Sequence, residues 1–202
     1  MESFISEIVE TGLWQGEASA WGVSSQATSE LFSLAQKLHS EKLFQPARVG
    51  KGITKTLASG IRRDEIHWLT EWQLSPLPMI AGLFREIQSL SRRELFLPVK
   101  RFEAHLSVYP SGAFYKTHVD RHRRLPSRLL SLVLYLNDMG EEGGGELKLY
   151  PKGRDEVVVH PQAGRMVIFD SRLRHEVCVT HQERWSLTCW FRSDEIVGIE
   201  GL

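Results

Sequence analysis

The chain has 202 residues, of which 42% are apolar and 25% charged, and its 25 basic side chains balance its 25 acidic ones. This neutral balance argues against a strongly basic surface for nucleic acid or membrane, and no apolar run approaches the roughly 20 residues of a membrane span. Two cysteines, Cys178 and Cys189, imply neither a disulfide framework nor a cysteine zinc site. We expect a cytoplasmic globular domain with no nucleic-acid or membrane partner, because the acidic start also lacks a signal-peptide pattern.

The first half of the chain carries two helical patterns. From Ser24 to Phe44, apolar residues recur at spacings of three and four, and Ser25 or Thr28 can cap the helix. A second helix is expected to begin after Pro78, because Met79 to Leu90 carries a similar stripe. We expect both helices to back a sheet.

Between the two helices lies a segment of different character. Residues 45–60, QPARVGKGITKTLASG, contain glycines and basic residues but no acidic residue and no helical stripe. This composition predicts either an exposed hairpin or a mobile loop. The run IRRDEIHWL follows, and its expected anchors are Ile61, Ile66, Trp68 and Leu69.

After Pro98 the sequence changes to short strands separated by turn-rich peptides such as Pro110-Ser111-Gly112. We expect eight strands, near residues 99–109, 114–119, 129–137, 145–150, 156–160, 165–170, 176–180 and 184–191. This punctuation predicts a mainly β fold with flanking helices, a double-stranded β-helix or jelly roll. One domain is predicted over residues 1–202, with about 1–97 as helical support and about 98–192 as the jelly-roll core.

The strand near 129–137 indicates how the sheet is built. Leucine occupies positions 130, 132, 134 and 136, whereas the alternate positions are Ser131, Val133 and Tyr135. Alternate side chains of a strand face opposite sides. We therefore expect the leucine face to pack on the helices and the mixed face to look into a ligand cavity.

His118 and Asp120 stand two residues apart in an extended segment, so that their side chains project to the same side. A distant histidine, such as His175, would complete a set of two histidines and one carboxylate, which suits non-haem Fe(II) with open positions. Taken alone, such a pair recurs by chance, and an isolated strand histidine is more often structural. Most of the other histidines are expected at the surface or in loops: His39, His67, His105, His122, His160 and His181.

The last predicted strand supplies a second cluster. Arg184, Thr188 and Trp190 share a strand parity, which places a guanidinium, a hydroxyl and an aromatic ring on one surface, whereas Cys189 faces the other way. We interpret this surface as a carboxylate-binding arginine beside the metal site.

Six motifs, in order, resemble the Fe(II)- and 2-oxoglutarate-dependent dioxygenases. They are IRRDEIHWL, VYPSGAFYKTHVD, RLLSLVLYLN, GGELKLYPKG, GRMVIFDSRLRHEV and RWSLTCWF, and they extend from about Gly60 to Phe191. The chain most closely resembles the prolyl hydroxylases of the hypoxia-inducible-factor (egg-laying-defective-nine) type and their bacterial relatives. Collagen-type prolyl hydroxylases characteristically use a lysine where this chain has Arg184, which favours the former branch.

The resemblance implies a role for each matching residue. The implied catalytic residues and Fe(II) ligands are His118, Asp120 and His175. The residues implied to bind 2-oxoglutarate are Arg184 and Tyr135 at its distal carboxylate, Tyr109 near its metal-chelating end, and Val133, Leu147 and Thr188 along the pocket. The residues implied to lie near the substrate are Arg128, Trp190 and Tyr115.

The implied activity is 2-oxoglutarate- and O2-dependent hydroxylation of a prolyl residue in a protein, which yields hydroxyproline, succinate and CO2. Ascorbate is a candidate further cofactor. The enzyme is expected to be a monomer. Its implied partner is a protein substrate that presents a proline in a flexible loop, and a translation factor such as elongation factor Tu is one candidate. Basic residues of two loops are candidate contacts, although solvated loops fit equally well: Arg48, Lys51, Lys55 and residues 121–124.

Two alternatives stay open on the sequence alone. The first keeps the oxygenase chemistry but acts on a free amino acid, another side chain or a nucleobase. The second is a cupin-like metal- or ligand-binding sensor without catalysis. Arg184 and Tyr135 argue against the sensor, because a bare metal site has no need of a carboxylate-binding arginine.

Overall fold

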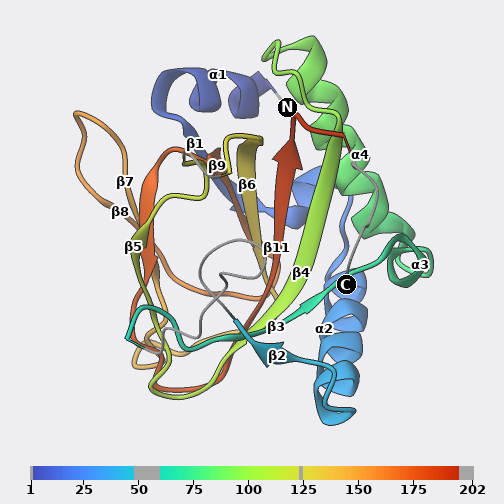
Figure 1. Ribbon diagram of the computed structural model, residues 1–202, viewed down its shortest axis with the longest axis vertical. Coiled ribbons are helices and arrows are strands. Elements are labelled where there is room, and N and C mark those ends of the chain that lie inside the picture. The colour runs from blue at the N-terminus through green and yellow to red at the C-terminus, as the bar shows by residue number, and fades with distance from the viewer. Residues whose placement is uncertain (1, 48–59, 123–124, 196–202) are drawn as a thin grey trace.

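Two antiparallel β-sheets form the centre of the fold, and helices cover the outer face of the larger one (Figure 1). The computed structural model describes residues 2–47, 60–122 and 125–195. The helices are α1 (Glu2–Thr11), the short 3-10 helix η1 (Ala18–Trp21), α2 (Ser25–Ser40), α3 (Glu71–Leu74) and α4 (Pro78–Arg93). The strands are β1 (Leu13–Glu17), β2 (Gln45–Pro46), β3 (Glu65–Trp68), β4 (Arg101–Tyr109), β5 (Tyr115–His118), β6 (Arg128–Tyr135), β7 (Leu147–Tyr150), β8 (Val157–Val159), β9 (Arg165–Asp170), β10 (Arg174–Val177) and β11 (Arg184–Arg192). The predicted fold class is confirmed.

The two helices predicted from their apolar stripes are α2 and α4. Ser24 caps α2, because its side chain accepts a hydrogen bond from a backbone N–H of the first turn. The helix ends at Ser40 rather than at the predicted Phe44, since Lys42 adopts a left-handed backbone with φ of 59°. Helix α4 begins at Pro78, whose fixed φ and missing N–H suit the first helical position.

The larger sheet has the strand order β1-β9-β6-β11-β4-β3-β2, and the smaller sheet has the order β5-β10-β7-β8. Strand β1 was not predicted, and it extends the larger sheet by pairing Leu13 with Phe169 of the distant β9. The strand expected at residues 176–180 spans Arg174–Val177 instead. His175 therefore lies within a strand rather than before one, and it pairs directly with His118.

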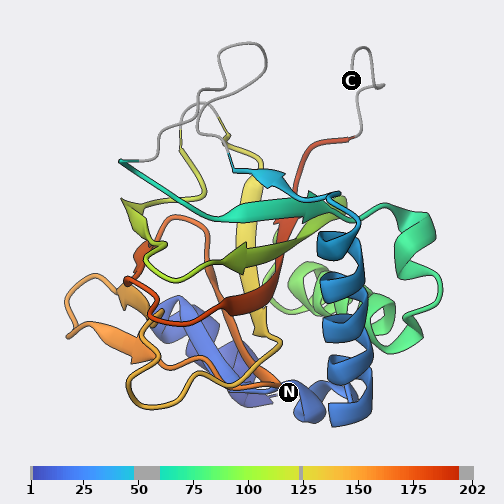
Figure 2. The same ribbon diagram turned by 90° about the horizontal axis from the view of Figure 1, so that it is seen from below.

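The two faces of the larger sheet bury different surfaces. Leu132 and Leu134 of β6 belong to one large cluster with Leu31 of α2 and Phe84 of α4. Tyr135 belongs to a second cluster on the opposite face, between the two sheets. Figure 2 shows α2 and α4 on one side of the larger sheet and the smaller sheet on the other. The alternation predicted for β6 is confirmed.

The segment before the jelly roll differs in part from its prediction. The run IRRDEIHWL contains β3, but Ile61 and Trp68 are 41% and 42% exposed, so these two expected anchors are not core residues. Strand β2 pairs with β3, whereas residues 48–59, with their candidate contacts, lie outside the described ranges, as do residues 123–124. Within those ranges, no helix combines the length and apolarity that crossing a bilayer demands.

Candidate active site

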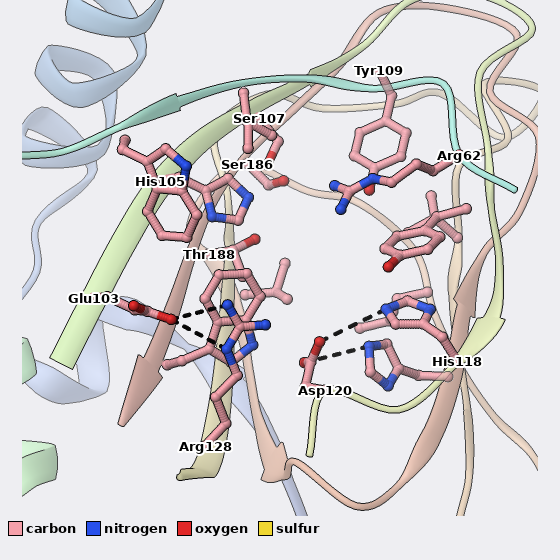
Figure 3. A pocket seen from close by; sticks show the side chains of 18 of the residues that line it. Arg62, Glu103, His105, Ser107, Tyr109, His118, Asp120, Arg128, Ser186 and Thr188 are labelled. Carbon is pink, nitrogen blue, oxygen red and sulfur yellow. Dashed lines mark hydrogen bonds and ion pairs between the residues drawn. The ribbon is translucent and has the colours of Figure 1, made fainter. Parts of the chain in front are cut away.

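A cavity of about 960 Å³ opens between the two sheets (Figure 3). Eleven of the twelve site residues predicted from the sequence line it: Tyr109, Tyr115, His118, Asp120, Arg128, Val133, Leu147, His175, Arg184, Thr188 and Trp190. The twelfth, Tyr135, is fully buried beside the cavity, where the guanidinium carbon of Arg184 lies 4.9 Å from its ring centre. The fold thus brings all twelve together.

Strand register fixes the order of residues along the cavity wall. The cross-strand pairs of β11 and β4 that face the cavity are, in order, Arg184–Tyr109, Ser186–Ser107, Thr188–His105 and Trp190–Glu103. At about 3.3 Å per residue, the backbone of Arg184 lies roughly 20 Å from that of Trp190. We call these limits the Arg184 end and the Trp190 end of the cavity.

His118, Asp120 and His175 form a compact group with one ligand atom each, and these atoms all lie within 4.8 Å of one another. A carboxylate oxygen of Asp120 lies 3.5 Å from Nε2 of His175, and the other lies 3.8 Å from Nε2 of His118. The pairing of β5 with β10 places the two histidines side by side. Figure 3 shows His118 facing Asp120. Two nitrogens and one carboxylate oxygen are a donor set that suits Fe(II).

The charge states of this group also suit a metal ion. Burial and the neighbouring His175 lower the pKa of His118 to about 3. Burial alone would raise the pKa of Asp120, but charge interactions with His175 and His118 outweigh burial and lower it below the usual value. A neutral imidazole and an ionised carboxylate are the forms that bind metal ions.

Hydrogen bonds orient the three side chains. Nδ1 of His118 and Nδ1 of His175 each lie 2.9 Å from a backbone carbonyl oxygen, which can only accept, so Nδ1 carries the proton and Nε2 is left free. The Ser131 hydroxyl donates to Oδ2 of Asp120 at 2.7 Å, and Ser171 lies 2.8 Å from Ser131. Because Ser131 has a single proton to donate, it accepts from Ser171, and both serines are fully buried.

Arg184 is a buried cation that has no carboxylate partner in the described part of the chain. It is 2% exposed, and its Nη1 donates to Ser186 at 3.2 Å. Among the described residues, its Nε and the hydroxyl of Tyr135 have no hydrogen-bond partner, and Arg184 forms no ion pair. Burial raises the pKa of Tyr135, which keeps this hydroxyl protonated and able to donate. Unpaired buried donors beside a cation call for an anionic ligand.

Gly145 lies against the Arg184 side chain. A Cβ built on it would come within 2.9 Å of Cδ of Arg184, and its φ of +71° is strained for any other residue. Glycine at this position therefore leaves the space that the guanidinium side chain occupies.

Beside the metal-binding group, the partly buried Arg62 forms an ion pair with the buried Asp64, which was not predicted. Burial tends to lower the pKa of Arg62, but the pairing with Asp64 outweighs burial and raises it. The guanidinium lies 4.2 Å from the ring centre of Tyr115, which stacks on His118 at 3.6 Å. This series of contacts holds Tyr115 and His118 at the edge of the cavity.

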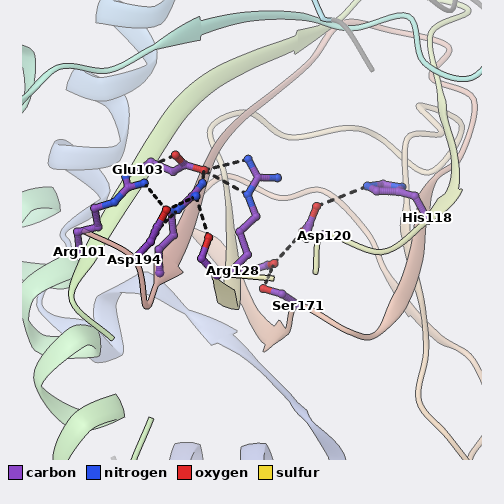
Figure 4. A network of polar contacts seen from close by, with 10 residues as sticks. Arg101, Glu103, His118, Asp120, Arg128, Ser171 and Asp194 are labelled. Atoms are coloured by element: carbon purple, nitrogen blue, oxygen red, sulfur yellow. Dashed lines mark hydrogen bonds and ion pairs between the residues drawn. The ribbon is translucent and has the colours of Figure 1, made fainter. Parts of the chain in front are cut away.

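The Trp190 end is built from paired charges (Figure 4). Glu103 accepts hydrogen bonds from Arg128 at 2.9 Å and from Arg192 at 2.6 Å, and Arg192 also pairs with Asp194 at 2.7 Å. The guanidinium carbon of Arg128 lies 3.5 Å from the ring centre of Trp190. Arg128 is therefore held over Trp190 by charge and by stacking.

Most of the remaining histidines were expected at the surface or in loops, and His105 is an exception, since it is 3% exposed and lines the cavity. Its strand β4 presents Glu103, His105, Ser107 and Tyr109 to the cavity. The sequence holds a signal for this row, since polar residues occupy alternate positions in a strand with apolar residues between them.

The residues present fit an iron and a 2-oxoacid with a second carboxylate. His118, Asp120 and His175 could hold the metal ion, and their donor set leaves open positions. The unpartnered Arg184 Nε and Tyr135 hydroxyl could bind a carboxylate at the far end of the same ligand.

Comparisons with known proteins agree with this geometry. The model of the 2OG-Fe(II) oxygenase superfamily matches residues 104–192. A prolyl-4-hydroxylase from Pseudomonas putida is 30% identical, with a TM-score of 0.84 over 95% of this chain and 98% of that one. No curated protein matches the chain.

Two more distant solved structures share the fold. A prolyl hydroxylase from Trichoplax adhaerens, in complex with a peptide fragment of the hypoxia-inducible-factor oxygen degradation domain, is 20% identical, with a TM-score of 0.83 over 98% of this chain and 91% of that one. The viral collagen prolyl hydroxylase of Paramecium bursaria Chlorella virus-1, in complex with 2-oxoglutarate, is 17% identical, with a TM-score of 0.62 over 92% and 98% of the two chains.

Proposed function

Because the chain belongs to the 2OG-Fe(II) oxygenase superfamily, in which it is a dioxygenase that uses Fe(II), 2-oxoglutarate and O2, we propose that it hydroxylates a prolyl residue of a protein substrate. The observation that carries the proposal is the 30% identity to the Pseudomonas putida prolyl-4-hydroxylase over nearly the whole of both chains. The peptide held by the Trichoplax enzyme, which has the same fold, supports a protein substrate. A flexible loop of a translation factor such as elongation factor Tu is a candidate target.

In this proposal, His118, Asp120 and His175 hold Fe(II). Bound there with 2-oxoglutarate and O2, the iron supplies oxidative decarboxylation to succinate and CO2, coupled to hydroxylation of a substrate C–H bond. The two Nδ1–H groups keep each imidazole in the tautomer that presents Nε2. The hydroxyl of Ser131 fixes the Asp120 carboxylate against rotation.

At the Arg184 end, Arg184 and Tyr135 bind the distal carboxylate of 2-oxoglutarate. Tyr109, which is opposite Arg184 in the register of β11 and β4, would approach the metal-chelating end of the same molecule. A planar guanidinium suits a carboxylate because it can donate two parallel hydrogen bonds. The apolar and hydroxyl side chains that exclude water from this pocket are Val133, Leu147 and Thr188. Burial strengthens each polar contact in such a site.

The substrate enters from the Trp190 end, where Arg128 lies over Trp190, and Tyr115, which stacks on His118, lines the same cavity. We propose that the whole chain is one domain, because α2 and α4 share a buried cluster with the larger sheet and so support the wall of the cavity.

The experiment that tests the proposal compares proteomes of the host with and without the active enzyme. We expect one or a few prolyl peptides to carry an additional oxygen atom only when the enzyme is active. A host that expresses Asp120→Ala is the matched control, because the protein is present without its metal ligand. If only small metabolites differ between the two, the substrate is not a protein and the proposal is wrong.

A further inference from the structure

The cavity is larger than the cosubstrate requires. Its volume of about 960 Å³ lies at the upper end of pockets that enclose drug-sized ligands, whereas 2-oxoglutarate is a five-carbon dicarboxylate. Arg184 and Trp190 lie roughly 20 Å apart along the strand, which exceeds the length of such a molecule. The Trp190 end therefore remains available for a second, larger ligand.

His105 is an unsatisfied polar group in the wall of this second region. The side chain is 3% exposed, and its Nδ1 has no hydrogen-bond partner among the described residues. Figure 3 shows it across the cavity from His118, on the strand that also carries Glu103 and Ser107. Buried polar atoms in folded proteins are almost always hydrogen-bonded, so an unpartnered one on a side chain of the cavity wall is available to a ligand group.

Neighbouring groups keep His105 neutral. Burial, together with the positive charges of Arg62 and Arg128, lowers the pKa of His105 well below its ordinary value. A neutral imidazole has one donor and one acceptor nitrogen, which matches a peptide amide better than it matches a charged side chain. Glu103 and Asp194 already pair with Arg128 and Arg192, so this end offers little free charge for an ionic substrate group.

Two aromatic rings contact the imidazole, and they also contact each other, with 5.9 Å between the ring centres of Trp68 and Trp190. Trp68 lies 5.1 Å and Trp190 lies 5.0 Å from it between ring centres, and Trp68 is directly opposite His105 in the register of β3 and β4. Trp190 is in turn held by Arg128 and Glu103. Flat aromatic surfaces beside one hydrogen-bonding group are suited to an uncharged, extended peptide that contains an apolar ring such as that of proline.

We propose that His105 is a substrate-binding residue whose imidazole hydrogen-bonds a backbone amide of the peptide segment that carries the target proline. This inference rests on the proposed function and assigns part of its substrate recognition to a residue of β4. Trp68 and Trp190 hold the imidazole in place and contact the same segment.

The test uses the full chain with Fe(II) and 2-oxoglutarate, and a library of synthetic peptides with a central proline flanked by varied residues. His105→Phe keeps an aromatic ring in contact with the two tryptophans but removes the hydrogen bond, and His105→Asn restores an amide donor and acceptor. His39→Phe is the matched control, since His39 also contacts a tryptophan, Trp185, in an edge-to-face arrangement, but does not line the cavity.

We expect His105→Phe to lower kcat/KM for the hydroxylated peptides by roughly 10- to 100-fold, the range for losing a buried hydrogen bond, and His105→Asn to recover part of it. The KM for 2-oxoglutarate, the melting temperature and the ranking of peptides should stay as in the wild type, and His39→Phe should change none of them.

Distinct results overturn the inference and the proposed function. If His105→Phe hydroxylates peptides as the wild type does, or weakens 2-oxoglutarate binding to the same extent, His105 does not bind the substrate. A changed preference at one flanking position would mean contact with a side chain and overturn the backbone assignment. If the wild type consumes 2-oxoglutarate but hydroxylates no prolyl peptide or protein, the proposed function fails, and this inference fails with it.

Discussion

The two ends of the cavity hold their arginines in opposite ways. At the Arg184 end, the guanidinium is buried, donates to the neutral Ser186, and has no carboxylate partner among the described residues. At the Trp190 end, Arg128 and Arg192 share Glu103, and Arg192 also pairs with Asp194. A buried cation is costly unless it is paired, so the unpaired arginine requires a ligand, whereas the paired ones stabilise the wall.

The largest effect is expected from Asp120→Ala. Loss of the anionic ligand should lower Fe(II)-dependent turnover by at least about 1,000-fold, because it removes a charge that holds the metal ion. Succinate formation measures the turnover, and calorimetric titration with Fe(II) measures binding. Asp170→Asn is a suitable control, since Asp170 pairs with Arg172 outside the cavity. Retention of most activity by Asp120→Ala would mean that another group completes the metal site.

Arg184→Gln tests the unpaired arginine. It should raise the KM for 2-oxoglutarate by roughly 100- to 1,000-fold, since the bound carboxylate would lose its charged partner in a buried site. Without ligand, the variant should melt at the same temperature as the wild type or higher, because a costly unpaired charge is removed. Added 2-oxoglutarate should then stabilise it less than the wild type. An unchanged KM would show that the carboxylate binds elsewhere.

Ser131→Ala tests the support of the metal ligand. Loss of the hydrogen bond to Asp120 should weaken Fe(II) binding by about 10- to 100-fold, as is usual for groups that orient metal ligands. Anaerobic calorimetry measures this, with Ser131→Thr as the conservative variant. Ser107→Ala is the control, because Ser107 lines the cavity without contacting Asp120. Equal Fe(II) affinity in Ser131→Ala and the wild type would show that Asp120 needs no such support.

Arg192→Gln should have the smallest effect, and it should change the stability of the fold rather than cosubstrate binding. It leaves Glu103 and Asp194 short of a partner, so the free energy of unfolding should fall by about 1 kcal/mol while the KM for 2-oxoglutarate stays unchanged. Chemical denaturation measures the first quantity and steady-state kinetics the second. The contrast between paired and unpaired arginines fails if Arg192→Gln and Arg184→Gln change the same quantity.

Much of the Arg184 end could be predicted from the sequence, because it depends on strand alternation. Arg184, Thr188 and Trp190 occupy even-numbered positions of β11, and Val133 and Tyr135 occupy odd-numbered positions of β6. Each set lies on one face of its strand, so that knowing the strands was enough to orient these side chains. The roles implied for them came from a resemblance rather than from spacing, and their test is kinetic.

The Trp190 end was harder to predict, because its partners come from strands far apart in the chain. His105 is buried by Trp68 of β3 and Trp190 of β11, and neither neighbour is visible in the local pattern of β4. The pairing of β1 with β9 was missed for the same reason. Helix α2 is shorter than predicted because the chain adopts a left-handed backbone at Lys42, although the apolar pattern in the sequence continues to Phe44.

The central claim is that His118, Asp120, His175 and Arg184 form an Fe(II) and 2-oxoglutarate site whose cosubstrate binding is separable from the peptide contacts at the Trp190 end. Anaerobic titration of the purified protein with Fe(II) and then 2-oxoglutarate tests it most directly through the visible metal-to-ligand charge-transfer band. We predict a saturable band for the wild type and His105→Phe, a band that needs far more 2-oxoglutarate for Arg184→Gln, and none for Asp120→Ala. Absence of the band from the folded wild-type protein would contradict the account.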